Sequence, residues 1–151
     1  MRLYPPLLFQ RIWVKRFHRD FKGVDVKIAH SILNRNYNSS IFGGTIYSAC
    51  DPFFAVLYDQ IFRKQGYQTK IWLKSASIEY LKPGRTALYF SLRLTDQDIE
   101  QAKQGLDTAG KFIHTFPIEI KDKHGEVYAK ALHEIYIRNL KYNRKQPVMV
   151  Y

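Results

Sequence analysis

Apolar residues at helical spacing mark one long segment in the first half of the chain. Between residues 45 and 62, an apolar side chain recurs every three or four positions. One face of this predicted helix carries Ile46, Cys50, Phe53, Leu57 and Ile61, with Ala49, Phe54 and Tyr58 beside them. A helix that is apolar around most of its circumference should be buried. Pro52 lacks a backbone N–H and should bend the helix near its first turns, and Gly66 lies just past its expected end.

The second half of the chain alternates between apolar and polar positions, which is the pattern of half-buried strands. We predict strands over residues 70–81, 86–95, 111–121 and 126–138. In the first of these strands, the alternating positions are Trp72, Ala76, Ile78 and Tyr80. The inner face of the last strand carries Val127, Ala129, Ala131, His133, Ile135 and Ile137. The last two strands form a hairpin around residues 122–125.

The remaining segments complete the predicted order of elements. Residues 8–17 do not distinguish a strand from a short amphipathic helix, and the two prolines before them delay its start. Residues 24–33 alternate as a strand, residues 34–40 are a polar loop, and residues 96–105 form a short helix capped by Thr95 or Asp96. One or two strands, a buried helix and four mostly antiparallel strands predict an α+β fold in which a sheet wraps around one central helix. That arrangement is the hot-dog fold, and residues 1–151 contain no linker or repeat, so we predict one domain.

The segment from residue 36 to residue 52 combines two features with chemical meaning. Gly43 and Gly44 stand at the start of the predicted helix, and the carboxylate of Asp51 follows two turns inside it. Free backbone N–H groups at a helix N-terminus attract a phosphate, a carboxylate or a developing oxyanion. A carboxylate nearby can serve as a general base or a nucleophile. This combination predicts a site that splits an ester or thioester.

Each of these residues also has a purely structural interpretation. The glycine pair allows the helix to pack close to a strand, and Asn36 in a polar loop is ordinarily a turn residue. Asp51 could cap or hydrogen-bond locally. Because a carboxylate in an apolar segment is hard to bury without a partner, we favour a functional site for Asp51.

The other chemically reactive side chains have ordinary structural interpretations. Cys50 is interpreted as a small core residue, because no histidine stands at a nucleophile spacing from it. His30 and His133 are interpreted as packing residues with one hydrogen bond each. His114 and His124 are not arranged as metal ligands, so we expect no metal and no cofactor.

The same segment resembles the signature of hot-dog acyl-CoA thioesterases of the phenylacetic-acid-degradation type. That signature is an asparagine, a histidine followed by two glycines, and an acid. Asn36 lies six residues before Phe42, and Asp51 lies seven residues after Gly44, as in the signature. The segment from Tyr80 to residue 85 resembles the Tyr/Phe-x-x-Pro ending of the family's next strand. Within this superfamily, residues 34–37, 42–54 and 72 are most similar to the hot-dog domain-of-unknown-function family 4442, and the resemblance extends from about residue 5 to residue 137.

The resemblance implies a role for each matching residue. Asp51 would activate water or attack the thioester carbonyl directly, and the N–H groups of Gly43 and Gly44 would polarise that carbonyl. Asn36 would orient the substrate or the lytic water. Two positions depart from the pattern, since Phe42 replaces the histidine and Leu73 replaces a serine found in some members.

The leading hypothesis is therefore an acyl-CoA thioesterase. The resemblance implies a homodimer or homotetramer with the site between subunits, where Gly43 and Asp51 would face Trp72 of the other chain. Substrate contacts are expected from Phe42, Tyr58, Trp72 and Lys74. Lys74, together with Lys82 and Arg85 near one strand end, could meet the phosphates of coenzyme A. The alternative is an acyl-ligand binder without turnover, which the departures at Phe42 and Leu73 favour.

Composition adds limits on compartment and partners. A hydrophobic content of 46%, with 11 Tyr and 10 Phe, argues against disorder. The single cysteine excludes an internal disulfide and fits a reducing compartment, and no long apolar run precedes the charges at residues 11–16. We therefore expect a cytoplasmic protein without a signal peptide or membrane span. The net charge of +11 suits a nucleic-acid surface, an anionic membrane surface, a phosphorylated ligand such as coenzyme A, or simply a solvated basic surface. Because no nucleic-acid recognition motif is present, a nucleic-acid-binding module ranks third; the basic tail, about residues 139–151, is interpreted as a loose terminus.

Overall fold

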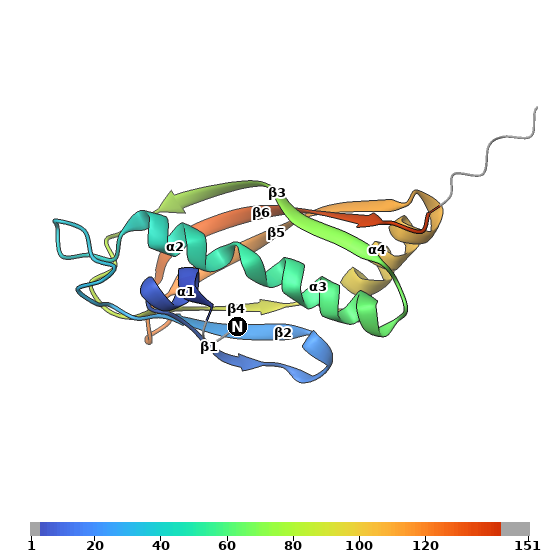
Figure 1. Cartoon of the computed structure of the whole chain (residues 1–151). Coiled ribbons are helices and arrows are strands. Elements are labelled where there is room, and N and C mark those ends of the chain that lie inside the picture. The colour runs from blue at the N-terminus through green and yellow to red at the C-terminus, as the bar shows by residue number, and fades with distance from the viewer. Residues whose placement is uncertain (1–3, 143–151) are drawn as a thin grey trace, which may run out of the picture.

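The computed structural model describes residues 4–142, whose strands form one antiparallel sheet. The strands are β1 (Ile12–Phe17), β2 (Gly23–Ile28), β3 (Thr69–Tyr80), β4 (Leu88–Arg93), β5 (Lys111–Lys121) and β6 (Val127–Asn139). They lie in the order β1-β2-β4-β5-β6-β3, so β1 and β3 are the edges. Figure 1 shows the sheet curving around the central helices, with β3, β6 and β5 on one side of them and β1, β2 and β4 on the other. The predicted α+β architecture, a sheet wrapped around a helix, is confirmed.

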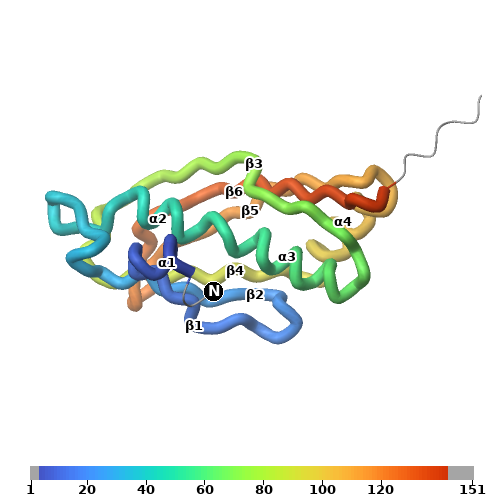
Figure 2. The backbone as a smooth tube through the Cα atoms, viewed as in Figure 1, coloured from blue at the N-terminus to red at the C-terminus, as the bar shows by residue number. Residues whose placement is uncertain are grey.

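The central helix is divided at Asp51 into α2 (Gly43–Cys50) and α3 (Pro52–Lys64). Pro52 is the first residue of α3, where its missing N–H costs little, and Asp51 keeps helical backbone angles of φ −56° and ψ −57°. The two helices therefore continue one another along the inside of the sheet (Figure 2). The predicted helix is thus interrupted where Pro52 was expected to bend it, and Gly66, with φ +84°, lies just past the end of α3.

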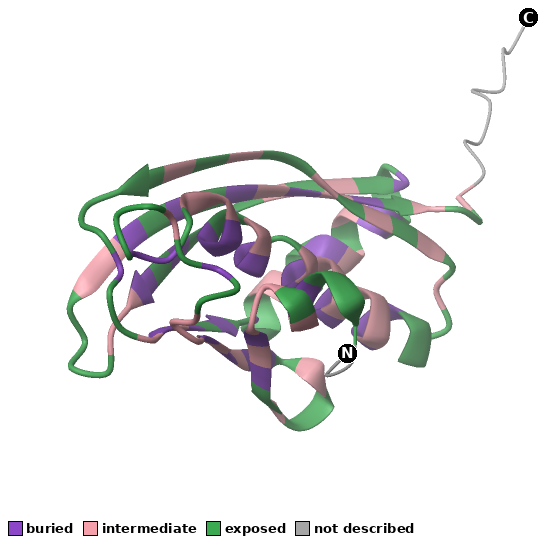
Figure 3. Ribbon diagram, turned by 60° about the vertical axis from the view of Figure 1, so that its left-hand side comes forward, coloured by how far each residue is buried: buried purple, intermediate pink, exposed green. Residues whose placement is uncertain are grey.

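The core lies between these helices and the inner face of the sheet. The fully buried side chains include Phe53, Leu57, Tyr58, Phe62, Leu88, Ile120, Ile135 and Ile137. Figure 3 shows buried positions alternating with exposed ones along the strands, as the period of a strand requires. Among residues 4–142, no helix is both long enough and apolar enough to cross a bilayer.

Strand β3 does not keep one alternation along its length. Its register against β6 shifts between Leu73 and Ser75, which marks a β-bulge. A bulge adds one residue to one strand and so exchanges its two faces. Before the bulge Leu73 packs on the core, while Trp72 lies on the outer face and stacks on Tyr136 with ring centroids 4.3 Å apart. The prediction that Trp72 shares a face with Ala76 is therefore wrong.

The N-terminal segment differs from its prediction in two ways. The two prolines begin a short helix, α1 (Pro5–Phe9), instead of delaying structure, because proline suits the first turn of a helix. Strand β2 ends at Ile28, earlier than predicted. The buried Asn34 holds the chain that follows, since its Nδ2 donates to the carbonyl oxygens of Gln10 at 2.8 Å and Ala29 at 2.7 Å.

The connection from β4 to the final hairpin follows the prediction closely. Helix α4 (Asp96–Thr108) begins at Thr95, whose hydroxyl accepts from the Asp98 amide while the Asp98 carboxylate accepts from the Thr95 amide. The hairpin of β5 and β6 is confirmed. In contrast, β4 and β5 form a single ladder pair, Tyr89 with Lys121. The predicted basic tail at residues 139–151 lies mostly outside the described residues.

A hydrogen-bonded network joins β1, β2 and β4 on the outer face of the sheet. The carboxylate of Asp25 accepts from Arg93 at 2.8 Å, Ser91 at 2.7 Å and Arg16 at 3.1 Å, and it lies 2.9 Å from Nε2 of His18. Partial burial alone would raise the pKa of Asp25, but these hydrogen bonds hold that pKa well below its usual range. We call these residues the Asp25 network.

Candidate functional site

The N-terminus of α2 presents two free backbone amides. Phe42 precedes it in extended conformation, with φ −56° and ψ 129°, and no side chain caps this end. The amides of Thr45 and Ile46 return to the Phe42 carbonyl at 2.9 and 3.3 Å. The amides of Gly43 and Gly44 have no intrahelical acceptor, as at any helix start, and no other backbone partner among residues 4–142. This end of α2 is therefore suited to bind negative charge.

Tyr80, the last residue of β3, covers Gly43. Its hydroxyl donates to the Gly43 carbonyl at 2.8 Å, and a Cβ on Gly43 would lie 3.1 Å from the Tyr80 ring. Glycine at this position thus lets α2 pack close to β3, which is the structural interpretation that the sequence also allowed for the glycine pair. Burial raises the pKa of Tyr80, and the nearby Cys50 and Tyr47 act in the same direction.

Asn36 organises its own loop. Its Oδ1 accepts from the Asn38 amide at 3.0 Å, the Ser40 amide at 3.2 Å and the Ser40 hydroxyl at 3.1 Å. This is the turn role that asparagine commonly takes. Because Oδ1 is occupied, a substrate contact would have to come from Nδ2, for which the described residues show no hydrogen bond.

Asp51 lies exposed at the junction of α2 and α3, so the cost of burying an unpartnered carboxylate, which favoured a functional site for it, does not arise in this structure. Its side chain does not cap α3, and no hydrogen bond or ion pair joins its carboxylate to another group in residues 4–142. Eight residues separate Asp51 from Gly43, which at about 1.5 Å of rise per residue is about 12 Å along the helix axis. The acid and the free amides of one chain are therefore too far apart to act on one carbonyl group.

His133 is a buried polar group on the inner face of the sheet, as predicted, but it was not assigned to the site. It lies on the inner face of β6 with 0% exposure, in register with Ala76 of β3 and Phe116 of β5. Across from it, the Tyr47 ring of α2 lies with its centroid 6.3 Å away. Neither ring nitrogen of His133 has a hydrogen-bond partner within residues 4–142.

One hydrogen bond was expected for each of His30 and His133, and the described residues provide it for His30 only. Nε2 of His30 lies 2.8 Å from the Ser39 carbonyl oxygen, whereas His133 has no such partner among the described groups. Burial lowers the pKa of His133, and the negative charge of Asp51 opposes that shift. The sequence signal that could have assigned His133 to the site is that it is the one imidazole among otherwise apolar inner positions of β6.

The four expected substrate contacts lie in three different places. The Phe42 ring, 58% exposed, lies against Gly44, so it borders the free amides. Tyr58 is fully buried and stacks on Phe62 with ring centroids 5.7 Å apart. Trp72, 41% exposed, lies on the outer face of the sheet, away from α2.

Lys74 also lies away from α2. It stands at the β3 bulge, and its Nζ lies 2.7 Å from Oε1 of Glu134. Because Lys74 is in the middle of β3, it does not share a strand end with Lys82 and Arg85, and that part of the prediction is wrong. Lys82 itself pairs with Glu126.

Cys50 is a core residue, as predicted. Its thiol is fully buried and donates to the Ile46 carbonyl at 3.4 Å. Burial raises the pKa of Cys50 to about 12, with a further contribution from the charge of Asp51. A thiol in this state is not a nucleophile near neutral pH. Within residues 4–142, no three His, Cys, Asp or Glu side chains are grouped as metal ligands.

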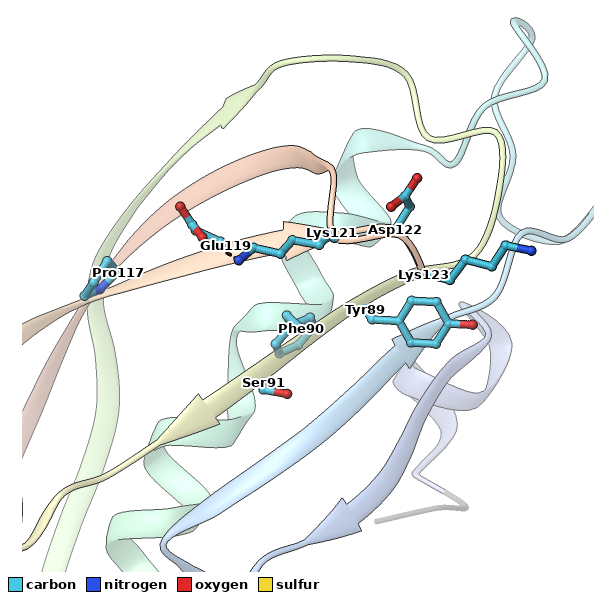
Figure 4. Close-up of a pocket in the computed structure, with 9 residues that line it drawn as sticks. Tyr89, Phe90, Ser91, Pro117, Glu119, Lys121, Asp122 and Lys123 are labelled. Carbon is cyan, nitrogen blue, oxygen red and sulfur yellow. Dashed lines mark ion pairs between the residues drawn. The ribbon is translucent and has the colours of Figure 1, made fainter.

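A cavity of about 670 Å³ lies where β4 and β5 separate. Its lining includes Tyr89, Ser91 and Lys123, and Glu119 pairs there with Lys121 at 2.8 Å (Figure 4). Neither Asp51 nor the α2 amides line this cavity, so it is separate from the candidate site around α2.

The chain belongs to the family described as domain of unknown function DUF4442, whose model matches residues 1–137. This match confirms the family that the resemblance indicated. None of the curated proteins matches the chain.

Three solved structures illustrate the shared architecture. A protein of unknown function from Pseudomonas aeruginosa, described as a probable thioesterase, has 16% identity and a TM-score of 0.72, covering 88% of this chain and 86% of that one. A protein of unknown function from Chlorobaculum tepidum has 12% identity and a TM-score of 0.75, covering 90% and 87%. A thioesterase from Haemophilus influenzae has 9% identity and a TM-score of 0.66, covering 93% and 87%. At these identities the likeness establishes the fold, and the predicted hot-dog fold is confirmed.

Proposed function

We propose that this chain hydrolyses an acyl thioester of coenzyme A at a site built on α2. The observation that carries the proposal is a pair of groups on α2 that have no partner among residues 4–142, the amides of Gly43 and Gly44 and the carboxylate of Asp51. Amides at a helix start stabilise the oxyanion of acyl transfer, and a carboxylate serves as base or nucleophile. The family resemblance assigns the same roles to the same residues.

Two chains would have to contribute to each site. A base must lie within hydrogen-bond reach of the proton it takes, and about 12 Å along α2 separates the two groups of one chain. In a two-fold dimer with antiparallel α2 helices, the amides of one chain lie beside the Asp51 carboxylate of the other. The edge strand β3, twelve residues long, offers a surface for such pairing. The proposed assembly is a homodimer, or a tetramer built from it.

The proposed reaction is an ordinary thioester hydrolysis. The amides of Gly43 and Gly44 hold the carbonyl oxygen while a water molecule attacks the carbonyl carbon and gives a proton to Asp51. The tetrahedral intermediate then loses coenzyme A as the C–S bond breaks, and the thiolate takes up the proton from Asp51. Phe42 and the amide nitrogen of Asn36 would border the acyl group.

The test is thiol release from a panel of short, medium, long and aromatic acyl-CoAs. We expect Asp51→Asn to lower kcat/KM on the order of 100-fold or more. The matched control is Asp59→Asn, which removes an acid of α3 that pairs with Arg63 at 3.1 Å; it should retain activity within about twofold. Turnover unaffected by Asp51→Asn would place the chemistry elsewhere. Binding of acyl-CoA without thiol release would favour the alternative function, a ligand-binding protein, consistent with Phe42 in place of an imidazole.

A further inference from the structure

His133 occupies a position where an apolar residue would be expected. Its neighbours on the inner face of β6, Ala131 and Ile135, are buried and apolar, as are most inner residues of the sheet. A buried polar group without a hydrogen bond destabilises a fold, so such a group is usually explained by a bound water or a functional role. No protein group among residues 4–142 accepts from or donates to the His133 ring.

The groups around His133 narrow the identity of its partner. Its register neighbours, Ala76 and Phe116, have no polar side-chain atoms. From α2, the Tyr47 ring faces the imidazole with its centroid 6.3 Å away, and Asp51 follows one helical turn after Tyr47. Tyr80 marks the level of Gly43 on β3, and four strand residues back, about 13 Å, is Ala76, the register neighbour of His133; Asp51, about 12 Å along α2 from Gly43, is therefore at the level of His133. His114 lies two residues before Phe116 on β5. Asp51 and His133 thus lie at the same end of α2, and neither has a side-chain partner within the described residues 4–142.

The two groups are chemically complementary. A neutral imidazole has one N–H donor and one acceptor nitrogen, and a carboxylate accepts only. A water molecule between them can donate one O–H to the carboxylate and the other to the acceptor nitrogen. Its lone pair then points away from both groups, which is the orientation that attack on a carbonyl carbon requires.

We propose that His133 is a positioning residue that acts through a water molecule shared with Asp51. This inference deepens the proposed thioesterase function and rests on it for the reaction. In the step, the water oxygen forms the new bond to the carbonyl carbon while its proton on the Asp51 side moves to the carboxylate. The other O–H stays hydrogen-bonded to His133, which remains neutral throughout. In this way the His133 imidazole supplies a hydrogen-bonding group to a site in which Phe42 replaces the histidine of the family signature.

The kinetic test compares His133→Leu, His133→Gln and wild-type protein on the best acyl-CoA of the panel. We expect His133→Leu to lower kcat on the order of 10-fold or more with KM within about twofold, because the substrate does not contact the imidazole. His133→Gln should recover part of the loss, since its amide can hold the water. The double variant with Asp51→Asn should lose no more activity than Asp51→Asn alone.

A stability measurement separates positioning from packing. Because one water molecule satisfies only one of the two buried ring nitrogens of His133, replacing the imidazole by leucine should raise the melting temperature by about 2–4 °C while the activity falls. Full activity in His133→Leu would overturn the proposal. A fall in activity together with a fall in melting temperature, with no recovery in His133→Gln, would also overturn it and leave a structural role.

The pair can be examined without turnover by recording imidazole ¹⁵N signals of the full chain. The His133 signal is the one that His133→Leu removes. We expect Asp51→Asn to change this signal and to lower its protonation midpoint, because the carboxylate favours the charged imidazole, whereas Asp59→Asn should not. If no acyl-CoA is hydrolysed, the proposed function fails. In that case, a His133 signal that changes in Asp51→Asn still supports the pairing of His133 with Asp51. A His133 signal that is unchanged in Asp51→Asn overturns that pairing.

Discussion

A site shared between two chains makes a quantitative prediction about mixtures of inactive variants. Gly43→Pro should remove one oxyanion donor while keeping the start of α2, although its Cβ would lie 3.1 Å from the Tyr80 ring, which must shift. Proline is favoured at the first position of a helix, and the extended Phe42 backbone suits the residue before a proline. Loss of one such donor costs on the order of 100-fold in rate. Gly43→Ala is the matched control, since it adds the same Cβ against Tyr80 but keeps the N–H.

The expected recovery follows from counting sites. In the proposed dimer, each site takes its amides from one chain and Asp51 from the other. A dimer of one Gly43→Pro chain and one Asp51→Asn chain then has one site with both defects and one site with neither. Random re-association of equal amounts makes half of the dimers mixed, so activity per chain should return to about 25% of wild type from about 1% for either variant alone.

The assay is thiol release after the two variants are unfolded together and refolded, with each variant refolded alone as the baseline. Two different affinity tags, applied in sequence, establish that mixed dimers form. Mixed dimers that stay at the baseline would refute the reasoning, because both groups of a working site would then come from the same chain. Recovery by the pair Gly43→Ala and Asp51→Asn should simply reflect the activity that Gly43→Ala retains.

Two further predictions follow from individual contacts. Asp25→Asn should lower the free energy of unfolding by about 1–2 kcal/mol at pH 7, measured by urea unfolding. Because the folded-state pKa of Asp25 is depressed, the stability that its carboxylate contributes is present above about pH 4 and is lost as the pH falls through the folded-state pKa. The stabilities of variant and wild type should therefore converge in acid, and a difference that stays constant with pH would contradict the role of the Asp25 network. Cys50, with its pKa raised to about 12, should not react with a thiol reagent at pH 8 in the native protein and should react fully in denaturant; rapid native labelling would show that the α2 packing opens.

Features that depend on a residue and its close neighbours in sequence were predicted well. The alternation of Leu88, Phe90 and Leu92 defines the inner face of β4, and the acidic start of α4 with Thr95 before it defines a capped helix. The helix around Asp51 followed from its apolar period, and the interruption within it from Pro52. Each of these signals repeats within a few residues, so the backbone geometry of a strand or helix is enough to interpret it.

Features that depend on exceptions to regular geometry were predicted poorly. A single bulge in β3 moved Trp72 to the outer face, and nothing in the alternation marks the residue at which a strand gains one position. The Pro5–Phe9 helix was missed for a similar reason, because proline can either delay a helix or begin one, and the segment that follows it determines which.

For the candidate site, the sequence by itself determined the chemistry of α2: free amides at the Gly43 end, a carboxylate at Asp51, and the distance along one helix that separates them. Only the tertiary structure decided that Asp51 is exposed, that Tyr80 covers Gly43, and that His133 lies buried across from α2. It also decided that neither Asp51 nor His133 has a side-chain partner in the described part of the chain. The difference between the features that the sequence determined and those that it did not has a physical cause. The spacing of groups within a helix is set by local backbone geometry, whereas the surroundings of His133 arise where β6, β3 and α2 meet, and those segments come together only when the sheet closes around the helix.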